Sequence, residues 1–176
     1  MARGFSHESQ KNESIEWYTP PSIFERIGLR YDLDPCSPGE GKSFVPADKF
    51  YTIEDDGLTS PWEGKVWMNP PYNSEIVPWM NKFKEHHNGI ALVFSRTDTQ
   101  WFQNVAATAD LICFISKRVK FYKGGMDHQP GTPGAGSCLI ANGKESVDAV
   151  LASGLGLCVE PRVIASAAPD TPIVVL

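Results

Sequence analysis

The sequence lacks the features that mark several large classes of protein. Its longest apolar stretch, Ala149 to Val159, is far shorter than the ~20 residues needed to cross a bilayer. The four cysteines lie far apart with no Cys-x-x-Cys spacing, which argues against a zinc site or a disulfide framework. The polar first residues contain no signal-peptide core. We therefore expect a cytoplasmic protein with reduced thiols and no membrane span.

An excess of positive charge is also missing. The chain has 16 Lys and Arg against 21 Asp and Glu, a formal net charge of −5. This excludes a protein that binds nucleic acid through bulk positive charge, so any such role must depend on a local basic patch. The 176 residues are 41% hydrophobic and 21% charged, a composition typical of one globular domain.

The chain divides into a flexible polar arm (1–15), a main domain (16–142) and a C-terminal extension of uncertain structure (143–176). Apolar patterns predict strands alternating with helices, which is typical of an α/β fold with a mostly parallel sheet. A helix is expected to begin at Thr19-Pro20-Pro21 and another to span Val77 to His87. The segments Val119–Tyr122 and Ser137–Ala141, around a glycine-rich loop, predict a C-terminal antiparallel hairpin. Strands are also expected at 29–33, 66–68, 90–94 and 111–115, a helix after Asp98, and irregular structure over most of 42–64.

The most informative segment is the tetrapeptide Asn69-Pro70-Pro71-Tyr72, which follows the apolar run Val66–Met68. That run is typical of a buried strand, and ligands in open α/β sheets bind beyond the carboxyl ends of strands. Two consecutive prolines fix the backbone between the polar and the aromatic residue. The alternatives are a rigid turn with a packed tyrosine or a polyproline recognition segment. We favour a catalytic role because the tetrapeptide directly follows a strand.

These residue types suit methyl transfer to the exocyclic amine of a nucleobase. Such an amine is a poor nucleophile because its lone pair is delocalised into the ring. The Asn69 side-chain oxygen and the Pro70 carbonyl can accept its two hydrogens and stabilise the developing positive charge. Tyr72 offers a flat face for a base rotated out of the double helix. No basic residue is needed, so the methyl donor must be strongly activated, as a sulfonium is.

The tetrapeptide and its surroundings resemble the small phage-type DNA adenine N6 methyltransferases, the phage Dam-like family. Asn-Pro-Pro-Tyr is the catalytic motif of amino methyltransferases that use S-adenosylmethionine. The resemblance covers about residues 15–142. It implies a trimmed Rossmann-like methyltransferase sheet, S-adenosylmethionine as cofactor and double-stranded DNA as partner. The segments that carry the resemblance are 16–20, 32–36, 55–58, 67–72 and 91–99, with Trp101-Phe102.

The resemblance also implies which residues hold the donor. The segment Tyr18-Thr19-Pro20 is similar to the piece that holds the methionine end, although Thr19 by itself equally suits a helix cap. The residues Asp34-Pro35-Cys36 resemble the start of the donor-binding loop, where a carboxylate accepts from the donor's ammonium.

The acidic pair Asp55-Asp56 is the candidate for binding the donor's ribose. The separation of Asp34 and Asn69 is short for this enzyme class, which implies that the usual second strand and helix are trimmed, so the resemblance does not place the ribose carboxylate. A solvated acidic turn is the alternative interpretation.

A basic segment, Lys117 to Lys123, contains four cations and two aromatic residues. Strand alternation would bring Arg118, Lys120 and Tyr122 to one face, where they suit phosphate contact and base stacking. A charge-protected edge strand is the alternative. The residues expected to contact DNA are Arg96, Lys117, Arg118, Lys120 and Tyr122.

We expect no metal site, since His86-His87 stand at a helix end where the dipole favours them. The sequence thus predicts a DNA methyltransferase that modifies adenine N6 of a flipped base, acting in the host-cell cytoplasm if it is phage-encoded. Methylation of RNA or of a protein glutamine, and a non-catalytic DNA-binding relic, are the alternatives. The chain has no room for a large target-recognition domain, which favours a short target or loose specificity.

Overall fold

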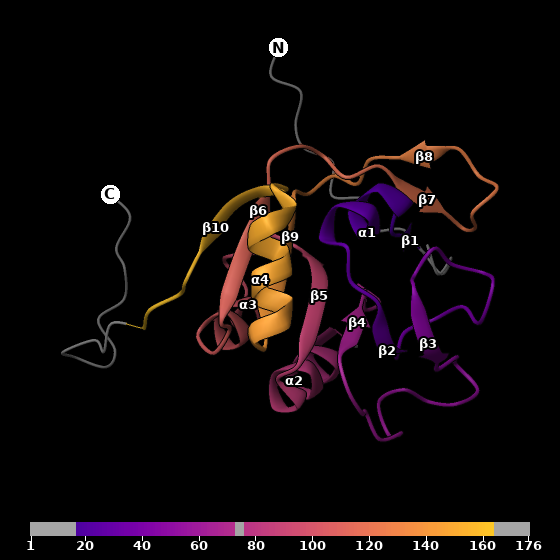
Figure 1. Ribbon diagram of the computed structural model, residues 1–176, viewed down its shortest axis with the longest axis horizontal. Coiled ribbons are helices and arrows are strands. Elements are labelled where there is room, and N and C mark those ends of the chain that lie inside the picture. Colours follow the sequence, from indigo (N-terminus) through magenta and orange to yellow (C-terminus); the bar gives the residue numbers. More distant parts are fainter. Residues whose placement is uncertain (1–16, 73–75, 164–176) are drawn as a thin grey trace, which may run out of the picture.

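The computed structural model describes residues 17–72 and 76–163, which form a seven-stranded sheet between two helical layers (Figure 1). The predicted arm and positions 164–176 lie outside the described residues. The strand order is β10-β6-β9-β5-β4-β2-β3. The strands are β2 (Tyr31–Asp34), β3 (Ala47–Phe50), β4 (Val66–Met68), β5 (Gly89–Phe94), β6 (Leu111–Ile115), β9 (Ser137–Asn142) and β10 (Gly156–Val159).

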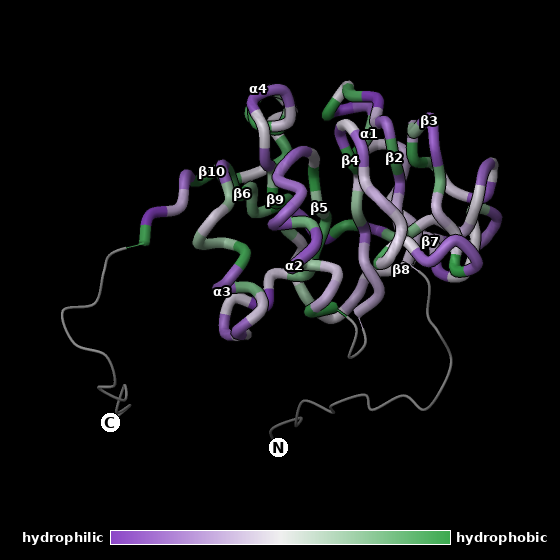
Figure 2. Tube along the Cα trace, turned by 90° about the horizontal axis from the view of Figure 1, so that it is seen from below, coloured by the Kyte–Doolittle hydropathy of each residue, from purple (hydrophilic) through white to green (hydrophobic). Residues whose placement is uncertain are grey.

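Two helices cover each face of the sheet (Figure 2). On one face lie α1 (Pro21–Ile27) and α4 (Lys144–Ser153), and on the other α2 (Ile76–His86) and α3 (Gln100–Ala106). Every residue of β4, β5 and β9 is buried, because a strand covered on both faces cannot alternate with solvent-facing positions. The α/β class and the strands at Val66–Met68, 90–94 and 111–115 are therefore confirmed.

The expectation of a mostly parallel sheet is wrong. Strands β3, β2, β4 and β5 run parallel to one another, whereas β9 is antiparallel to both β5 and β6, and β10 is antiparallel to β6. The parallel strands include β4, which leads directly into the tetrapeptide.

The predicted C-terminal hairpin is also wrong. The segment Ser137–Asn142 inserts between β5 and β6 as β9, while β7 (Phe121–Lys123) joins β1 (Trp17–Tyr18) and β8 (Pro130–Gly131) in a small antiparallel sheet. Burial explains the separation: all six residues of β9 are buried at the sheet centre, whereas β7 passes from a buried to an exposed residue.

The predicted helices form with small shifts at their ends. Helix α1 has Pro20 as N-cap and Pro21 in its first turn, and it ends at Gly28, whose φ of 70° allows its N–H to donate to the Phe24 carbonyl. The Thr19 side chain makes no capping hydrogen bond, so the helix-cap interpretation of Thr19 is wrong. Helix α2 buries one apolar stripe, Ile76, Trp79, Met80 and Phe83.

The C-terminal extension, whose structure the sequence left open, contributes one helix and one strand to the main sheet and its helical layers. Helix α4 packs on β9 and β6, and β10 forms the sheet edge beside β6. The irregular stretch 42–64 contains β3, followed by a turn-rich loop. In the part of the chain that the structure describes, no helix has the length and apolarity to cross a membrane.

Candidate active site

The order of the parallel strands reverses between β2 and β4. From β2 the chain moves outward to β3 and then crosses back to β4 on the other side of β2. Ligands in open α/β sheets bind beyond the carboxyl ends of the strands where the order reverses in this way. Asp34 is the last residue of β2 and Asn69 follows β4 directly. The topology therefore brings these two predicted site residues to one switch point.

The Asn69 amide is held by one of its two polar atoms. Its Nδ2 donates to the Trp17 carbonyl oxygen over 2.6 Å. A carbonyl can only accept a hydrogen bond, so this contact fixes the nitrogen toward Trp17 and turns Oδ1 away from it. Among the described residues Oδ1 has no hydrogen-bond partner although it is buried. The site thus contains a pre-oriented acceptor that is left unsatisfied.

Tyr72 is fixed at both its ring and its hydroxyl. The ring stacks on Phe94 at a centroid distance of 3.9 Å and an interplanar angle of 21°, and the hydroxyl donates to the Leu92 carbonyl at 3.1 Å. Burial raises the pKa of this hydroxyl well above its usual value. One face of the ring is therefore occupied by Phe94, and base stacking on Tyr72 concerns the opposite face.

A cavity of about 340 Å³ lies beside Tyr72, between the end of β5 and the start of α3. Arg96, one of the residues predicted to contact DNA, lines this cavity and is exposed. Its other lining residues are Tyr72, Ile76, Phe94, Asp98, Thr99 and Trp101. The cavity thus combines aromatic walls with one cation and one carboxylate, a lining suited to a flat polar ligand.

Asp34 is buried, with 3% of its surface exposed. Burial raises the pKa of its carboxyl to about 7, although hydrogen bonds from the Cys36 N–H and the Ser37 hydroxyl act in the opposite direction. Burial also raises the pKa of the Cys36 thiol well above its usual value, and the nearby Asp34 carboxyl raises it further. A buried carboxylate of this kind gains from a cationic ligand, because a cation offsets the cost of its ionisation.

The loop after Asp34 is tied to the acidic turn. A Cβ on Gly57 would come within 2.1 Å of the Pro35 carbonyl oxygen, so only glycine lets the two segments approach this closely. The Lys82 ammonium binds the same turn through the carbonyls of Gly57, Leu58 and Ser60.

The two acidic candidates in that turn are exposed and hold the turn itself. Asp55 accepts from the backbone and hydroxyl of Thr52, which lowers the pKa of its carboxyl. Asp56 has a φ of 48° and accepts from the Leu58 N–H and the Thr59 hydroxyl. These contacts match the acidic-turn interpretation, and a role toward the donor's ribose stays a prediction.

The segment Tyr18-Thr19-Pro20 joins β1 to α1 beside the tetrapeptide, since Trp17 of the same strand contacts Asn69. The Thr19 hydroxyl is buried and has no partner among the described residues. It is a second unsatisfied polar atom near the switch point.

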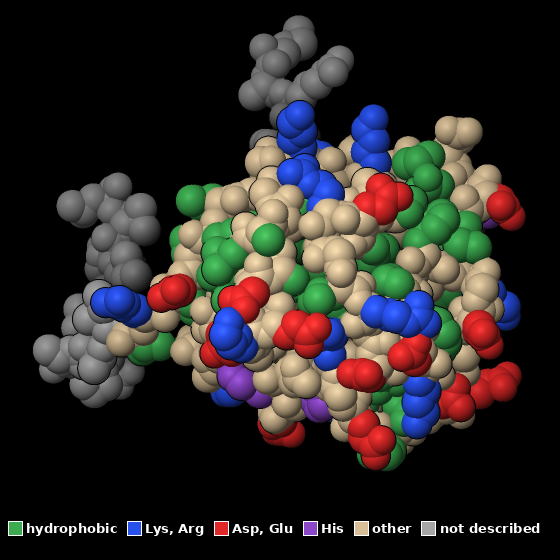
Figure 3. Space-filling model, in the orientation of Figure 1, with side chains coloured by type: hydrophobic (Ala, Val, Ile, Leu, Met, Phe, Trp, Pro, Cys, Tyr) green, Lys and Arg blue, Asp and Glu red, His purple; other side chains and the backbone are tan. Residues whose placement is uncertain are grey.

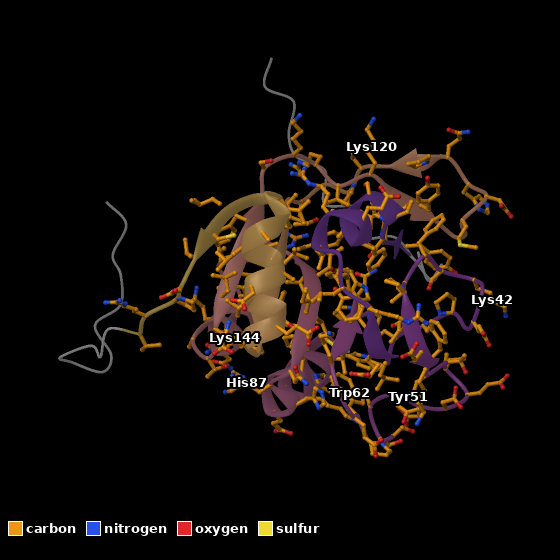
Figure 4. All side chains as sticks on the ribbon, in the orientation of Figure 1. Lys42, Tyr51, Trp62, His87, Lys120 and Lys144 are labelled. Atoms are coloured by element: carbon orange, nitrogen blue, oxygen red, sulfur yellow. The ribbon has the colours of Figure 1, made fainter. Side chains whose placement is uncertain are left out.

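The basic segment follows the predicted alternation, although β7 begins only at Phe121. Val119 and Phe121 are buried, while Arg118 and Lys120 are exposed. Lys117 is exposed too, and Lys and Arg side chains gather at this end of the molecule (Figure 3). Lys120 extends outward (Figure 4). Tyr122 instead packs against Phe44, with ring centroids 5.0 Å apart.

Three contributors were missed by sequence reasoning: the Trp17 carbonyl, Phe94 and Phe121. The only sequence signal for them is an aromatic residue at a strand end next to a motif.

Within residues 17–72 and 76–163, no three His, Cys, Asp or Glu side chains gather as a metal site would require. His86 contacts the Gly64 carbonyl through its Nε2 at 2.7 Å.

Comparison with known proteins gives one family. The model of the family described as DNA N-6-adenine-methyltransferase (Dam) matches residues 6–148. A search of curated proteins finds no match.

Proposed function

The chain belongs to the DNA N-6-adenine-methyltransferase (Dam) family, and from this premise we propose that it transfers a methyl group from S-adenosylmethionine to adenine N6 in double-stranded DNA. The target base is rotated out of the helix, and the reaction takes place on a Rossmann-like sheet. The strand reversal between β2 and β4 supports this, because such sheets bind their ligands there.

The observation that carries the proposal is the buried Asn69 Oδ1, which has no hydrogen-bond partner in the described part of the chain. A buried acceptor without a donor costs ~1–3 kcal/mol, and a substrate amine would supply the missing hydrogens. The Pro70 carbonyl is the second acceptor, and Pro70 and Pro71 hold both in place. As the amine attacks, its nitrogen gains positive charge, which these two oxygens stabilise more strongly than they stabilise the neutral base.

The residues at the switch point fit a donor with a positively charged end. The Asp34 carboxylate would accept from the ammonium of S-adenosylmethionine, with Pro35 and Cys36 shaping the loop. The Thr19 hydroxyl, between Tyr18 and Pro20, would bind the carboxylate of the same end, and Asp55 or Asp56 the ribose. When bound, the donor supplies an electrophilic methyl group on a sulfonium, so the chain needs no general base to make the attack possible.

DNA contact is assigned to the cations near the tetrapeptide. Lys117, Arg118 and Lys120 would contact phosphates, while Arg96 lies at the cavity beside Tyr72. Phosphate contacts hold the duplex in register and base contacts read it. Tyr122 is half-buried against Phe44, so its stacking role is limited to its remaining exposed surface.

The test is incubation with methyl-labelled S-adenosylmethionine and DNA, RNA or protein, followed by nucleoside analysis. We expect label in DNA as N6-methyladenine. Asn69→Ala should slow turnover by ~2–4 kcal/mol in barrier, the loss of one preorganised polar group, while donor affinity measured by calorimetry stays the same. Asn81→Ala, an exposed helix position, is the matched control. Label in RNA or protein, or an unchanged rate for Asn69→Ala, would contradict the proposal.

A further inference from the structure

Both ends of the tetrapeptide are linked to the same small sheet, Asn69 directly and Tyr72 through Phe94 of β5. At one end, the Asn69 amide donates to the carbonyl of Trp17 in β1. Strand β1 is only two residues long and pairs with β7, with Trp17 opposite Lys123 and Tyr18 opposite Tyr122. The backbone that orients Asn69 is therefore held by β7, which forms the last three residues of the basic segment.

At the other end, a row of aromatic rings leads from the small sheet to Tyr72. Trp17 meets Phe121 edge-on at 6.0 Å, Phe121 meets Phe94 edge-on at 6.3 Å, and Phe94 stacks on Tyr72 at 3.9 Å. Phe121 is completely buried and Phe94 is 8% exposed. Close-packed rings of this kind move together rather than singly.

We infer that the β1–β7–β8 sheet is the support that positions the tetrapeptide, with Trp17 as the positioning residue for Asn69 and Phe94 as the positioning residue for Tyr72. The inference rests on the proposed function. It assigns the small sheet a task beyond DNA contact. The sheet that includes the end of the basic segment also orients the Asn69 side chain, which would accept from the substrate amine.

The amide geometry explains why a support is needed. A side-chain amide can turn its oxygen or its nitrogen toward the substrate, and only the oxygen accepts from an amine. The Trp17 carbonyl selects the productive orientation before substrate arrives. The ring of Trp17, packed on Phe121, in turn holds that carbonyl. Without the ring, the short β1 loses its edge-on contact with Phe121, and a displacement of about 1 Å at a reacting group costs roughly 100-fold in rate.

The experiment compares Trp17→Ala, Trp17→Phe and Phe114→Leu in single-turnover methylation with saturating DNA and S-adenosylmethionine. Phe114 is a half-buried aromatic on β6, outside the row. We expect Trp17→Ala to lower the methyl-transfer rate about 10- to 100-fold, with DNA and donor affinities within twofold of the parent. Trp17→Phe, which keeps an edge contact to Phe121, should recover most of the rate, and Phe114→Leu should keep it.

A spectroscopic signal tests the support without catalysis. The Asn69 side-chain NH₂ resonances, assigned by their loss in Asn69→Ala, should move toward free-amide values in Trp17→Ala and stay in place in Phe114→Leu. Phe94→Leu should change the fluorescence of 2-aminopurine at the target position, because Tyr72 loses the ring that sets its plane.

Two outcomes overturn the inference. One is a parental rate together with parental Asn69 resonances in Trp17→Ala. The other is a loss confined to DNA affinity. Either result leaves the proposed function intact as long as the parent methylates DNA. Absence of methylation by the parent removes the proposed function, and the resonance comparison then still decides whether Trp17 orients the amide.

Discussion

Asn69 and Asp34 each bury a polar side-chain group at the carboxyl end of a strand. The Asn69 nitrogen donates to Trp17, whereas its Oδ1 has no hydrogen-bond partner among the described residues. Asp34 accepts two hydrogen bonds, yet burial raises the pKa of its carboxyl to about 7. Most buried polar groups in folded proteins are paired. Exceptions at a sheet's switch point are therefore expected where a ligand completes the pairing.

The raised pKa of Asp34 predicts a pH-dependent donor affinity. Below about pH 7 the empty protein holds this carboxyl neutral, and a neutral carboxyl attracts an ammonium weakly. Calorimetry should show S-adenosylmethionine binding more weakly at pH 6 than at pH 8. Asp34→Asn should bind it weakly at both, by ~1.5–3 kcal/mol for the lost charge-assisted bond. Equal affinity at both pH values in the parent would contradict this.

The stability of the protein without donor is the control for Asp34. It should change with pH in the opposite direction to donor affinity. The pKa of Asp34 rises from 3.8 to about 7 on folding, so between these values the folded chain binds a proton that the unfolded chain releases. The contribution of this group to the free energy of unfolding therefore falls as pH rises through that interval. Asp34→Asn should melt at a higher temperature than the parent above pH 7, while binding donor more weakly.

Tyr72 should act through its ring. Tyr72→Phe keeps the stack on Phe94 and should stay active, although it loses the hydrogen bond to Leu92. Tyr72→Ala removes the stacking face, a loss of ~1–3 kcal/mol for the extruded base. DNA-binding titrations with 2-aminopurine at the target position measure the difference. Identical behaviour of the two variants would make the tetrapeptide a structural turn.

At the scale of elements, β7 and β9 show how pairing depends on surroundings. Both segments have strand patterns, and the loop between them contains glycines and prolines typical of a hairpin. Strand β9 lies in the centre of the main sheet because all six of its residues can be buried. Strand β7 leaves Lys123 exposed and pairs in the small sheet instead. Local pattern predicts a strand, and burial on both faces decides its neighbours.

The basic segment should contribute to DNA affinity in a salt-dependent way. Arg118→Ala and Lys120→Ala should each weaken binding and reduce the slope of log affinity against log salt by about one unit per lost phosphate contact. Fluorescence anisotropy at several salt concentrations measures this. Lys144→Ala, an exposed cation on α4 paired with Asp148, is the control and should keep the parental slope. An unchanged slope in Arg118→Ala and Lys120→Ala would show that the segment is a charged surface without phosphate contacts.

For the whole molecule, β9 joins the parallel strands β3, β2, β4 and β5 to the antiparallel pair β6 and β10. It lies between β5 and β6 and pairs with both, so the parallel half that bears the site and the C-terminal half share one core. We therefore expect a single cooperative unfolding transition.

Leu139→Ala at the centre of β9, a fully buried position, should lower the free energy of unfolding by ~2–5 kcal/mol through the cavity that it leaves. Leu157→Ala on the edge strand β10, where the side chain is 67% exposed, should change it by less than ~0.5 kcal/mol. Urea denaturation followed by circular dichroism and by tryptophan fluorescence measures both. Two separate transitions would contradict a shared core.

The sequence alone was enough to predict that the tetrapeptide follows a strand, that a loop follows Asp34, and where most helices and strands lie, because each depends on local spacing and residue type. Only the tertiary structure decided that Trp17 meets Asn69, that Phe94 covers one face of Tyr72, and that β9 lies inside the sheet. These contacts join residues far apart in the sequence, 52 positions in the case of Trp17 and Asn69. Their pairing depends on which surfaces become buried together, and the free energy of that burial belongs to the assembled core rather than to any one segment.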